Sequence, residues 1–378
     1  MSISTQSPDV IAQLASEKRT WPGWSTIESE PAVFNELLKN IGVRDAQVEE
    51  VYSLDEDSLN AIKPVYGLIF LFRWKSEVDP EETEVSCPEG VWFANQVTDN
   101  LCASLAMLNI VMNCPDVDVG EHLRSFREFS RDLSPPLRGL ALANFEYLRQ
   151  CHNAFARKAE MMDSDIGLLG ASKRRKTTAE EEEEESFHFI AYVPIGNSLW
   201  ELDGLKRQPV KLGECTSETW LSLATPKIQE RILRYEQDEI RFTLLAIVKK
   251  PLTILQSQLS TNVKLVGLIE RRLDSLDANW KCALSEDSAN LGVDIDDTDV
   301  DQVMVADIES ELDAARLVDR RAKLVQEHDT LRFKIREEQE KLETYTTYAT
   351  RKQHDYSPFI RKMLGFLADN QSLQQYLE

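Results

Sequence analysis

The segment VWFANQVTDNLCASLAMLNIVMNC, residues 91–114, joins a polar loop to a strongly apolar helical pattern. From Cys102 onward, apolar residues recur at helical spacing and fill most of the helix circumference, so this helix is expected to be buried on nearly every side. Thr98, Asp99 and Asn100 precede the apolar run and are residue types that commonly cap a helix N-terminus. The pattern therefore predicts a buried central helix that starts close to Cys102.

Cys102 falls in the first turn of that helix, where free backbone amides and the helix dipole favour a thiolate. Gln96, in the loop that enters the helix, can supply a side-chain amide donor. A thiol in this position beside an amide donor is typical of a cysteine hydrolase. The alternative for an isolated cysteine is a buried structural residue, and a matching histidine and carboxylate are needed to decide against it.

A predicted β-hairpin supplies both groups. Residues 187–193 and 199–202 read as strands around a turn at Gly196. A symmetric antiparallel pairing places His188 directly opposite Asp203, with Cβ atoms about 5 Å apart. A slip of one residue would move the two side chains to opposite faces, so the prediction depends on the register.

These residues together suggest acyl-transfer chemistry. We interpret Cys102 as a nucleophile, His188 as its base and Asp203 as the carboxylate that orients the base, in a papain-like order. Gln96 and the backbone N–H of Cys102 would then stabilise the oxyanion.

Composition limits the remaining possibilities. The chain has 378 residues, of which 42% are hydrophobic, and a formal net charge of -22. This charge argues against direct nucleic-acid binding, which needs a basic surface. No apolar run is long enough for a membrane span, and the N-terminus does not resemble a signal peptide. The six cysteines contain no CxxC pair, which indicates a reducing compartment.

No metal or cofactor site is predicted. The acidic run around Asp297, Asp299 and Asp301 mimics a calcium-binding loop. Gln302 stands where such a loop needs glycine, and Ile308 stands where it needs a bidentate glutamate, so the run fails as an EF-hand.

The pattern along the chain predicts three regions. Residues 1–20 are polar and mixed and read as a mobile leader, while 21–250 alternate helices with strands and read as an α/β or α+β catalytic domain. Within that domain, 156–186 read as a long charged loop with a basic cluster and a glutamate run. Residues 251–378 read as a helical extension that ends in a short amphipathic helix from Tyr356, a type of segment that often docks onto a partner.

The elements expected within these regions are helices over 31–41, 119–129, 137–155, 252–269 and 303–348, and strands over 47–54, 65–74 and 240–248. His122, His328 and His354 are expected to be exposed. His152 is expected to be a packing or hydrogen-bonded residue, not a second base.

The chain resembles the ubiquitin C-terminal hydrolase family of cysteine deubiquitinases. The motifs that carry the resemblance are WSTIESEP at 24–31, VYGLIFLFRW at 65–74, FANQVTDNLC at 93–102, GLALAN at 139–144, HNAFAR at 152–157, FHFIAYVP at 187–194, ELDG at 201–204 and EIRF at 239–242. The resemblance is strongest to the proteasome-associated branch, which carries a C-terminal extension.

The resemblance implies an α+β, papain-like fold and thiol-dependent hydrolysis of the bond after the C-terminal glycine of ubiquitin. The family's oxyanion glutamine, nucleophile, base and acid fall on Gln96, Cys102, His188 and Asp203. Residues 156–186 take the place of the crossover loop that arches over the active site.

The resemblance also implies partners and a location. Ubiquitin and its conjugates would be substrates, and the tail from Tyr356 resembles one that binds the proteasomal ubiquitin receptor or a chromatin-remodelling complex. A cytoplasmic and nuclear location follows. The alternatives are a nuclear chromatin-associated deubiquitinase of the same family and a non-catalytic ubiquitin-binding assembly subunit.

Overall fold

The computed structural model describes residues 20–73, 87–157, 161, 187–235, 242–277, 280–283 and 301–369. The predicted mobile leader, the crossover loop with its basic cluster and glutamate run, and most of the acidic run before Asp301 lie outside these residues. Contacts divide the chain into two compact units, residues 1–248 with 345–378, and residues 249–344.

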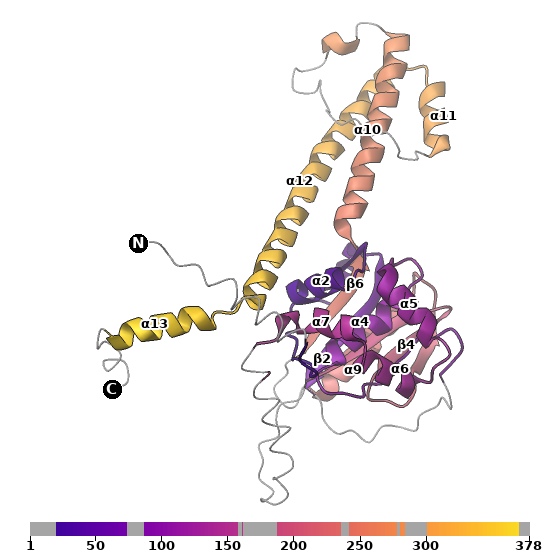
Figure 1. Cartoon of the computed structure of the whole chain (residues 1–378). Coiled ribbons are helices and arrows are strands. Elements are labelled where there is room, and N and C mark those ends of the chain that lie inside the picture. Colours follow the sequence, from indigo (N-terminus) through magenta and orange to yellow (C-terminus); the bar gives the residue numbers. More distant parts are fainter. Residues whose placement is uncertain are drawn as a thin grey trace, which may run out of the picture. The chain divides into compact units, whose positions relative to one another are not determined.

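The first unit is built on a six-stranded sheet with the order β1-β6-β2-β3-β4-β5 (Figure 1). The strands are β1 Ala46–Glu50, β2 Val65–Arg73, β3 Phe187–Ile195, β4 Ser198–Asp203, β5 Val210–Glu214 and β6 Thr243–Lys249. The pairings of β2 with β3 and β6, of β3 with β4, and of β4 with β5 are antiparallel. The predicted α+β class is confirmed.

Helices cover both faces of the sheet. Alternate strand residues such as Ile69, Ala191 and Leu202 pack in one core with helix α4, Cys102–Val111. The intervening residues pack in a second core with helix α9, Trp220–Tyr235. Strand β2 is therefore apolar on both sides and central, as its sequence predicts.

The remaining helices of the first unit are α2 Pro31–Asn40, α3 Glu56–Ala61, α5 Gly120–Ser130, α6 Pro135–Ala143, α7 Glu146–His152, the 3-10 turn Asn153–Phe155 and α13 Ser357–Asp369. The single helix predicted over 137–155 is wrong. The chain breaks after Ala143 because Phe145 takes an extended conformation, and Asn144 folds its side chain back onto the carbonyl oxygen of Leu140.

The hairpin register also differs from the prediction. Ile195 pairs with Ser198 around a two-residue turn that begins with Gly196 at φ 60°, and Asp203 therefore lies opposite Ile190 instead of His188. Side chains alternate between the faces of a strand, so this shift of two residues keeps His188 and Asp203 on one face as diagonal neighbours.

The C-terminal end of helix α12, Ala314–Gln353, belongs to the first unit from Tyr345 onward. Ala349 is buried in the α4 core, and Lys352 Nζ lies 2.7 Å from Glu28 Oε2. Tyr348 donates its hydroxyl to the same carboxylate at 3.4 Å. The chain thus returns to the first unit after passing through the second.

The second unit consists of helices α10 Pro251–Leu276 and α11 Gln302–Ser310, the 3-10 turn Trp280–Ala283 and α12 up to Thr344. The single helix predicted over 303–348 is interrupted because Glu311 is extended. No described helix is long and apolar enough to cross a membrane.

Polar residues lie inside this unit. Arg321 is buried, contacts Glu270 at 2.8 Å and lies over the Trp280 ring at 5.4 Å. The prediction that His328 is exposed is wrong, since only 1% of it is exposed, whereas His122 and His354 are exposed as predicted. His328 replaces an apolar residue in the helical stripe that faces the core, so its position, not its polarity, decides its burial.

We predict that His328→Leu stabilises the second unit. His328 Nε2 is buried and makes no hydrogen bond among the described residues, and such a group costs about 1–3 kcal/mol. Thermal unfolding followed by circular dichroism should show a higher Tm for this variant. His354→Leu, at an exposed position, should leave the Tm unchanged. A lower Tm for His328→Leu would contradict the prediction.

Candidate active site

Cys102 is the first residue of α4, and the helix begins without a side-chain cap. The expected cap from Thr98, Asp99 or Asn100 is wrong. Asn100 takes φ 62° and donates its side-chain amide to the carbonyl oxygen of Trp24 at 3.0 Å. The backbone amides of Ala103 and Cys102 lie close enough to the thiol to lower its pKa.

Burial controls the ionisation of this thiol. Burial raises the pKa of Cys102 to about 11, although the amides of Ala103 and Cys102 work in the opposite direction. The predicted preference for a thiolate is therefore outweighed here by desolvation. Leu101, the residue before Cys102, packs fully in the core.

His188 and Asp203 form a buried pair. His188 Nε2 lies 2.6 Å from Asp203 Oδ1, which also accepts a hydrogen bond from the Leu205 amide at 2.9 Å. Burial acts to raise the pKa of Asp203, but the hydrogen bond and charge of His188, the Leu205 amide and the charge of Lys206 outweigh it and hold this pKa below its ordinary value. The Phe72 ring meets the imidazole edge-on at 5.9 Å.

Because Nε2 faces Asp203, Nδ1 is the imidazole nitrogen that remains for proton exchange with a thiol. Within the described residues, no hydrogen bond joins Cys102 to His188. Proton transfer between the thiol and the imidazole therefore requires the two groups to come closer together.

Gln96 reaches the same end of the sheet. Its backbone N–H donates to the carbonyl oxygen of Gly204 at 2.8 Å, directly after Asp203. A Cβ at Gly204 would lie 2.5 Å from Cδ2 of Leu105 in the first turns of α4, so the Gly204 backbone lies close to this helix. The end of β4, the loop with Gln96 and the start of α4 therefore meet at one end of the sheet.

A charged cluster behind the His188–Asp203 pair was not predicted. The buried Glu201 lies 3.2 Å from Lys206 Nζ and 3.3 Å from an Arg231 nitrogen. Arg231 also donates to the Tyr192 hydroxyl at 3.3 Å and lies over the Phe72 ring at 5.5 Å. Lys206 and Arg231 thus compensate the negative charge of Glu201. The positive charge of Lys206 also favours the ionised form of Asp203.

His152 is hydrogen-bonded, as predicted. Its Nε2 lies 2.7 Å from the carbonyl oxygen of Ser25, which can only accept, so Nε2 carries the proton. Nδ1 then accepts from Ser104 Oγ at 2.8 Å. Burial lowers the pKa of His152 to about 4, against the hydrogen bond to Ser25. A neutral His152 therefore ties the first turn of α4 to the loop before α2.

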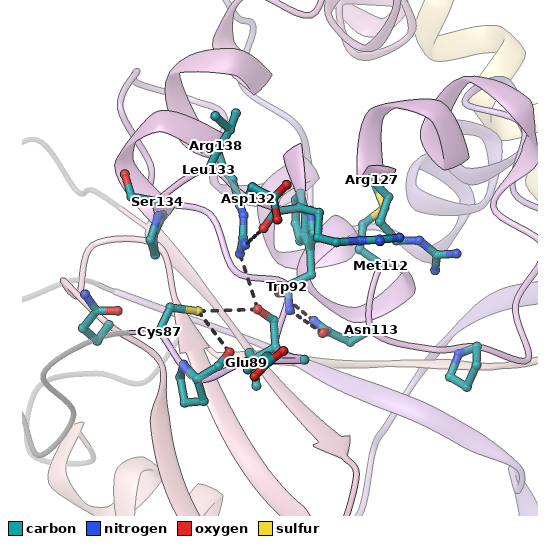
Figure 2. Close-up of a pocket in the computed structure, with 17 residues that line it drawn as sticks. Cys87, Glu89, Trp92, Met112, Asn113, Arg127, Asp132, Leu133, Ser134 and Arg138 are labelled. Atoms are coloured by element: carbon teal, nitrogen blue, oxygen red, sulfur yellow. Dashed lines mark hydrogen bonds between the residues drawn. The ribbon is translucent and has the colours of Figure 1, made fainter. Parts of the chain in front are cut away.

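A cavity of about 930 Å³ lies beside the segment that leads to Gln96 (Figure 2). Arg138 and Asn113 are on its wall, while Cys102, His188, Asp203 and Gln96 do not line it. No group of three or more His, Cys, Asp or Glu side chains that could hold a metal ion occurs in the described part of the chain.

Comparison with known proteins identifies the family. The family model described as "Ubiquitin carboxyl-terminal hydrolase, family 1" matches residues 24–233, which contain all four predicted site residues. The chain belongs to this family. A second model, "Ubiquitin carboxyl-terminal hydrolases", matches residues 329–373.

Relatives of this hydrolase match it along most of its length. Ubiquitin carboxyl-terminal hydrolase isozyme L5 of Dictyostelium discoideum is 35% identical over 94% of this chain and 94% of its own. Ubiquitin carboxyl-terminal hydrolase ubh-4 of Caenorhabditis elegans is 33% identical over 91% and 87%. The UCH37 catalytic domain of Trichinella spiralis, solved with ubiquitin vinyl methyl ester, is 37% identical over 60% of this chain and 96% of that one, with a TM-score of 0.48. The protein is a cysteine-type ubiquitin C-terminal hydrolase.

We predict that His152 makes this hydrolase less stable in acid. Between the ordinary histidine pKa of about 6.5 and the folded-state pKa of about 4, the unfolded chain binds a proton that the native state does not. Stability should fall as the pH drops through this window, by about 3 kcal/mol in total. The free energy of urea unfolding of His152→Gln should lose this part of its pH dependence.

His122→Gln, at an exposed histidine, is the matched control and should keep the wild-type pH dependence. An unchanged slope between pH 6.5 and pH 4 in His152→Gln would contradict the assignment of a neutral, buried imidazole.

Proposed function

We propose that this chain is a thiol-dependent deubiquitinase that hydrolyses the bond after the C-terminal glycine of ubiquitin. Cys102 is the nucleophile, His188 the base, Asp203 the orienting acid and Gln96 an oxyanion donor. The observation that supports this best is the buried 2.6 Å contact between His188 and Asp203, at the end of the sheet where α4 begins.

The geometry suggests how each group acts. A thiol with a pKa near 11 is protonated at neutral pH, so a base must remove its proton, and Nδ1 of His188 is the available nitrogen. The sulfur attacks the glycine carbonyl carbon, and the imidazolium protonates the leaving amine as the C–N bond breaks. His188 then takes a proton from water, which hydrolyses the thioester and regenerates the thiol.

Asp203 and Gln96 stabilise charges that develop in this reaction. Ionised Asp203 orients His188 and stabilises its imidazolium form, as the carboxylate of a triad does. The side-chain amide of Gln96 and the backbone N–H of Cys102 would donate to the oxyanion, and one such donor is worth about a hundred- to a thousandfold in kcat.

A non-catalytic ubiquitin-binding subunit is the alternative from another class. It does not require a buried histidine–carboxylate pair near a helix N-terminal thiol. Burying such a pair costs desolvation free energy, which is more readily explained by a catalytic role than by assembly alone.

We predict that a ubiquitin bearing an electrophilic C-terminus forms a covalent adduct at Cys102. Mass spectrometry of the digested adduct should locate the modification on that residue. Cys102→Ala should form no adduct and hydrolyse no ubiquitin conjugate, while its Kd for ubiquitin stays within about twofold of wild type. Cys114→Ala, which removes another free thiol, is the control and should react normally. Turnover by Cys102→Ala would refute the nucleophile.

We further propose that helix α13 binds the proteasomal ubiquitin receptor and that the protein acts in cytoplasm and nucleus. The described part of this helix exposes an apolar face, with Phe359 at 64% and Phe366 at 63% exposure. A chromatin-remodelling complex is the alternative partner of the same face. For a nuclear pool, the sequence offers the basic cluster at 173–176, which reads equally as a nuclear localisation signal or as part of a solvated loop.

We predict that Ile360→Asp weakens binding to the isolated receptor domain at least tenfold, because it places a charge in the apolar face of α13. Calorimetric titration measures the Kd. Arg361→Asp, on the next position around the helix, should change it less than threefold. Binding by the wild-type chain to a chromatin-remodelling subunit but not to the receptor would favour the alternative.

A further inference from the structure

The segment that precedes Gln96 is held on one side by α6 and by the turn that follows α4. Asn113 exchanges two hydrogen bonds with the Trp92 backbone, both at 2.7 Å, and Arg138 of α6 donates to the carbonyl oxygen of Phe93 at 3.1 Å. Figure 2 shows Asn113 and Arg138 reaching this segment from different elements. The backbone at Trp92 and Phe93 is therefore fixed, but these contacts end three residues before Gln96.

Asn95 continues the attachment to α6. Its N–H donates to the carbonyl oxygen of Pro135 at 3.1 Å. A Cβ at Gly139 would lie only 2.0 Å from the Asn95 carbonyl oxygen, so glycine is required for α6 to approach this residue. The main chain of Asn95 thus lies directly against the helix.

The side chain of Asn95 points to the other wall of the site. Its Nδ2 donates to the carbonyl oxygens of Lys206 at 2.6 Å and Gly204 at 3.4 Å. The carbonyl oxygen of Gly204 also accepts the Gln96 amide. Asn95 Oδ1 makes no hydrogen bond within the described residues, so this side chain acts through its donor.

The segment that Asn95 binds is the one that carries Asp203. Leu205 donates its amide to Asp203 Oδ1 and lies between the two carbonyls that Asn95 binds. One side chain therefore links the backbone of Gln96 to the backbone next to the His188–Asp203 pair, across more than a hundred residues of sequence.

We propose that Asn95 is a positioning residue for Gln96, which it holds in register with His188 and Asp203. This proposal rests on the proposed function. Asn95 does not contact the reacting atoms; its effect on rate passes through the placement of the Gln96 amide. Displacement of a catalytic group by about 1 Å can cost about a hundredfold in rate, so losing this link should lower kcat with little change in ubiquitin affinity.

A double-mutant cycle tests the proposal. In the full-length wild-type background, Asn95→Ala should lower the single-turnover rate on a fluorogenic ubiquitin conjugate about tenfold or more, with KM within twofold. In the Gln96→Ala background the same change should cost less than threefold, because the group that Asn95 positions is gone. Equal losses in both backgrounds would overturn the proposal and leave Asn95 with a general structural role.

Asn113→Ala is the matched control. It removes side-chain bonds to the same segment without contacting Gln96 or the Asp203 segment, so its effect on rate should be the same in both backgrounds. If Asn95→Ala fails to fold, Asn95→Ser keeps a shorter donor, and the same cycle applies. Reaction of every variant with the electrophilic ubiquitin separates the two proposals. An adduct at Cys102 together with a failed cycle would overturn only the role of Asn95. The absence of an adduct in the wild type would refute the proposed function itself.

Discussion

The hydrogen bond between His188 and Asp203 depends on antiparallel pairing of β3 and β4. Strand β2 and the helices on both faces of the sheet pack against these two strands. A polar pair can stay buried only if its partners are fixed, since each group would otherwise lose its solvation without compensation. Strand β2 supplies Phe72 against the imidazole, and α9 supplies Arg231 over that ring. On the opposite face, α4 packs against the same strands and brings Cys102 to the end of the sheet.

The contact between His188 and Asp203 could be predicted because both residue types and their strands are visible in the sequence. It also survives a register error of two residues, because such a shift keeps a side chain on the same face of the strand. The predicted hairpin placed His188 opposite Asp203, whereas the shorter turn at Gly196 moves Asp203 opposite Ile190. An even shift preserves the face, so the predicted contact survives as a diagonal one. A shift of one residue would have separated the two side chains.

Other features of the structure leave no recognisable signal in the sequence. The hydrogen bonds of Asn95 end on carbonyl oxygens, which every residue possesses, so no pattern of side chains marks them. Helix α9 contains Pro226, a residue type that is unfavourable inside a helix, and strand β5 is short and only partly buried. The missing cap of α4 is likewise invisible, because suitable residues are present and Asn100 binds elsewhere.

The return of α12 to the first unit gives the chain the topology of a domain insertion. The polypeptide leaves the first unit after Val248 and rejoins it at Tyr345, where Ala349 enters its core and Lys352 meets Glu28. Both ends of residues 249–344 are therefore anchored in the same body. The entropy of closing such a loop grows only slowly with its length, so evolution could lengthen, shorten or replace this helical insert at modest thermodynamic cost while leaving the catalytic scaffold intact.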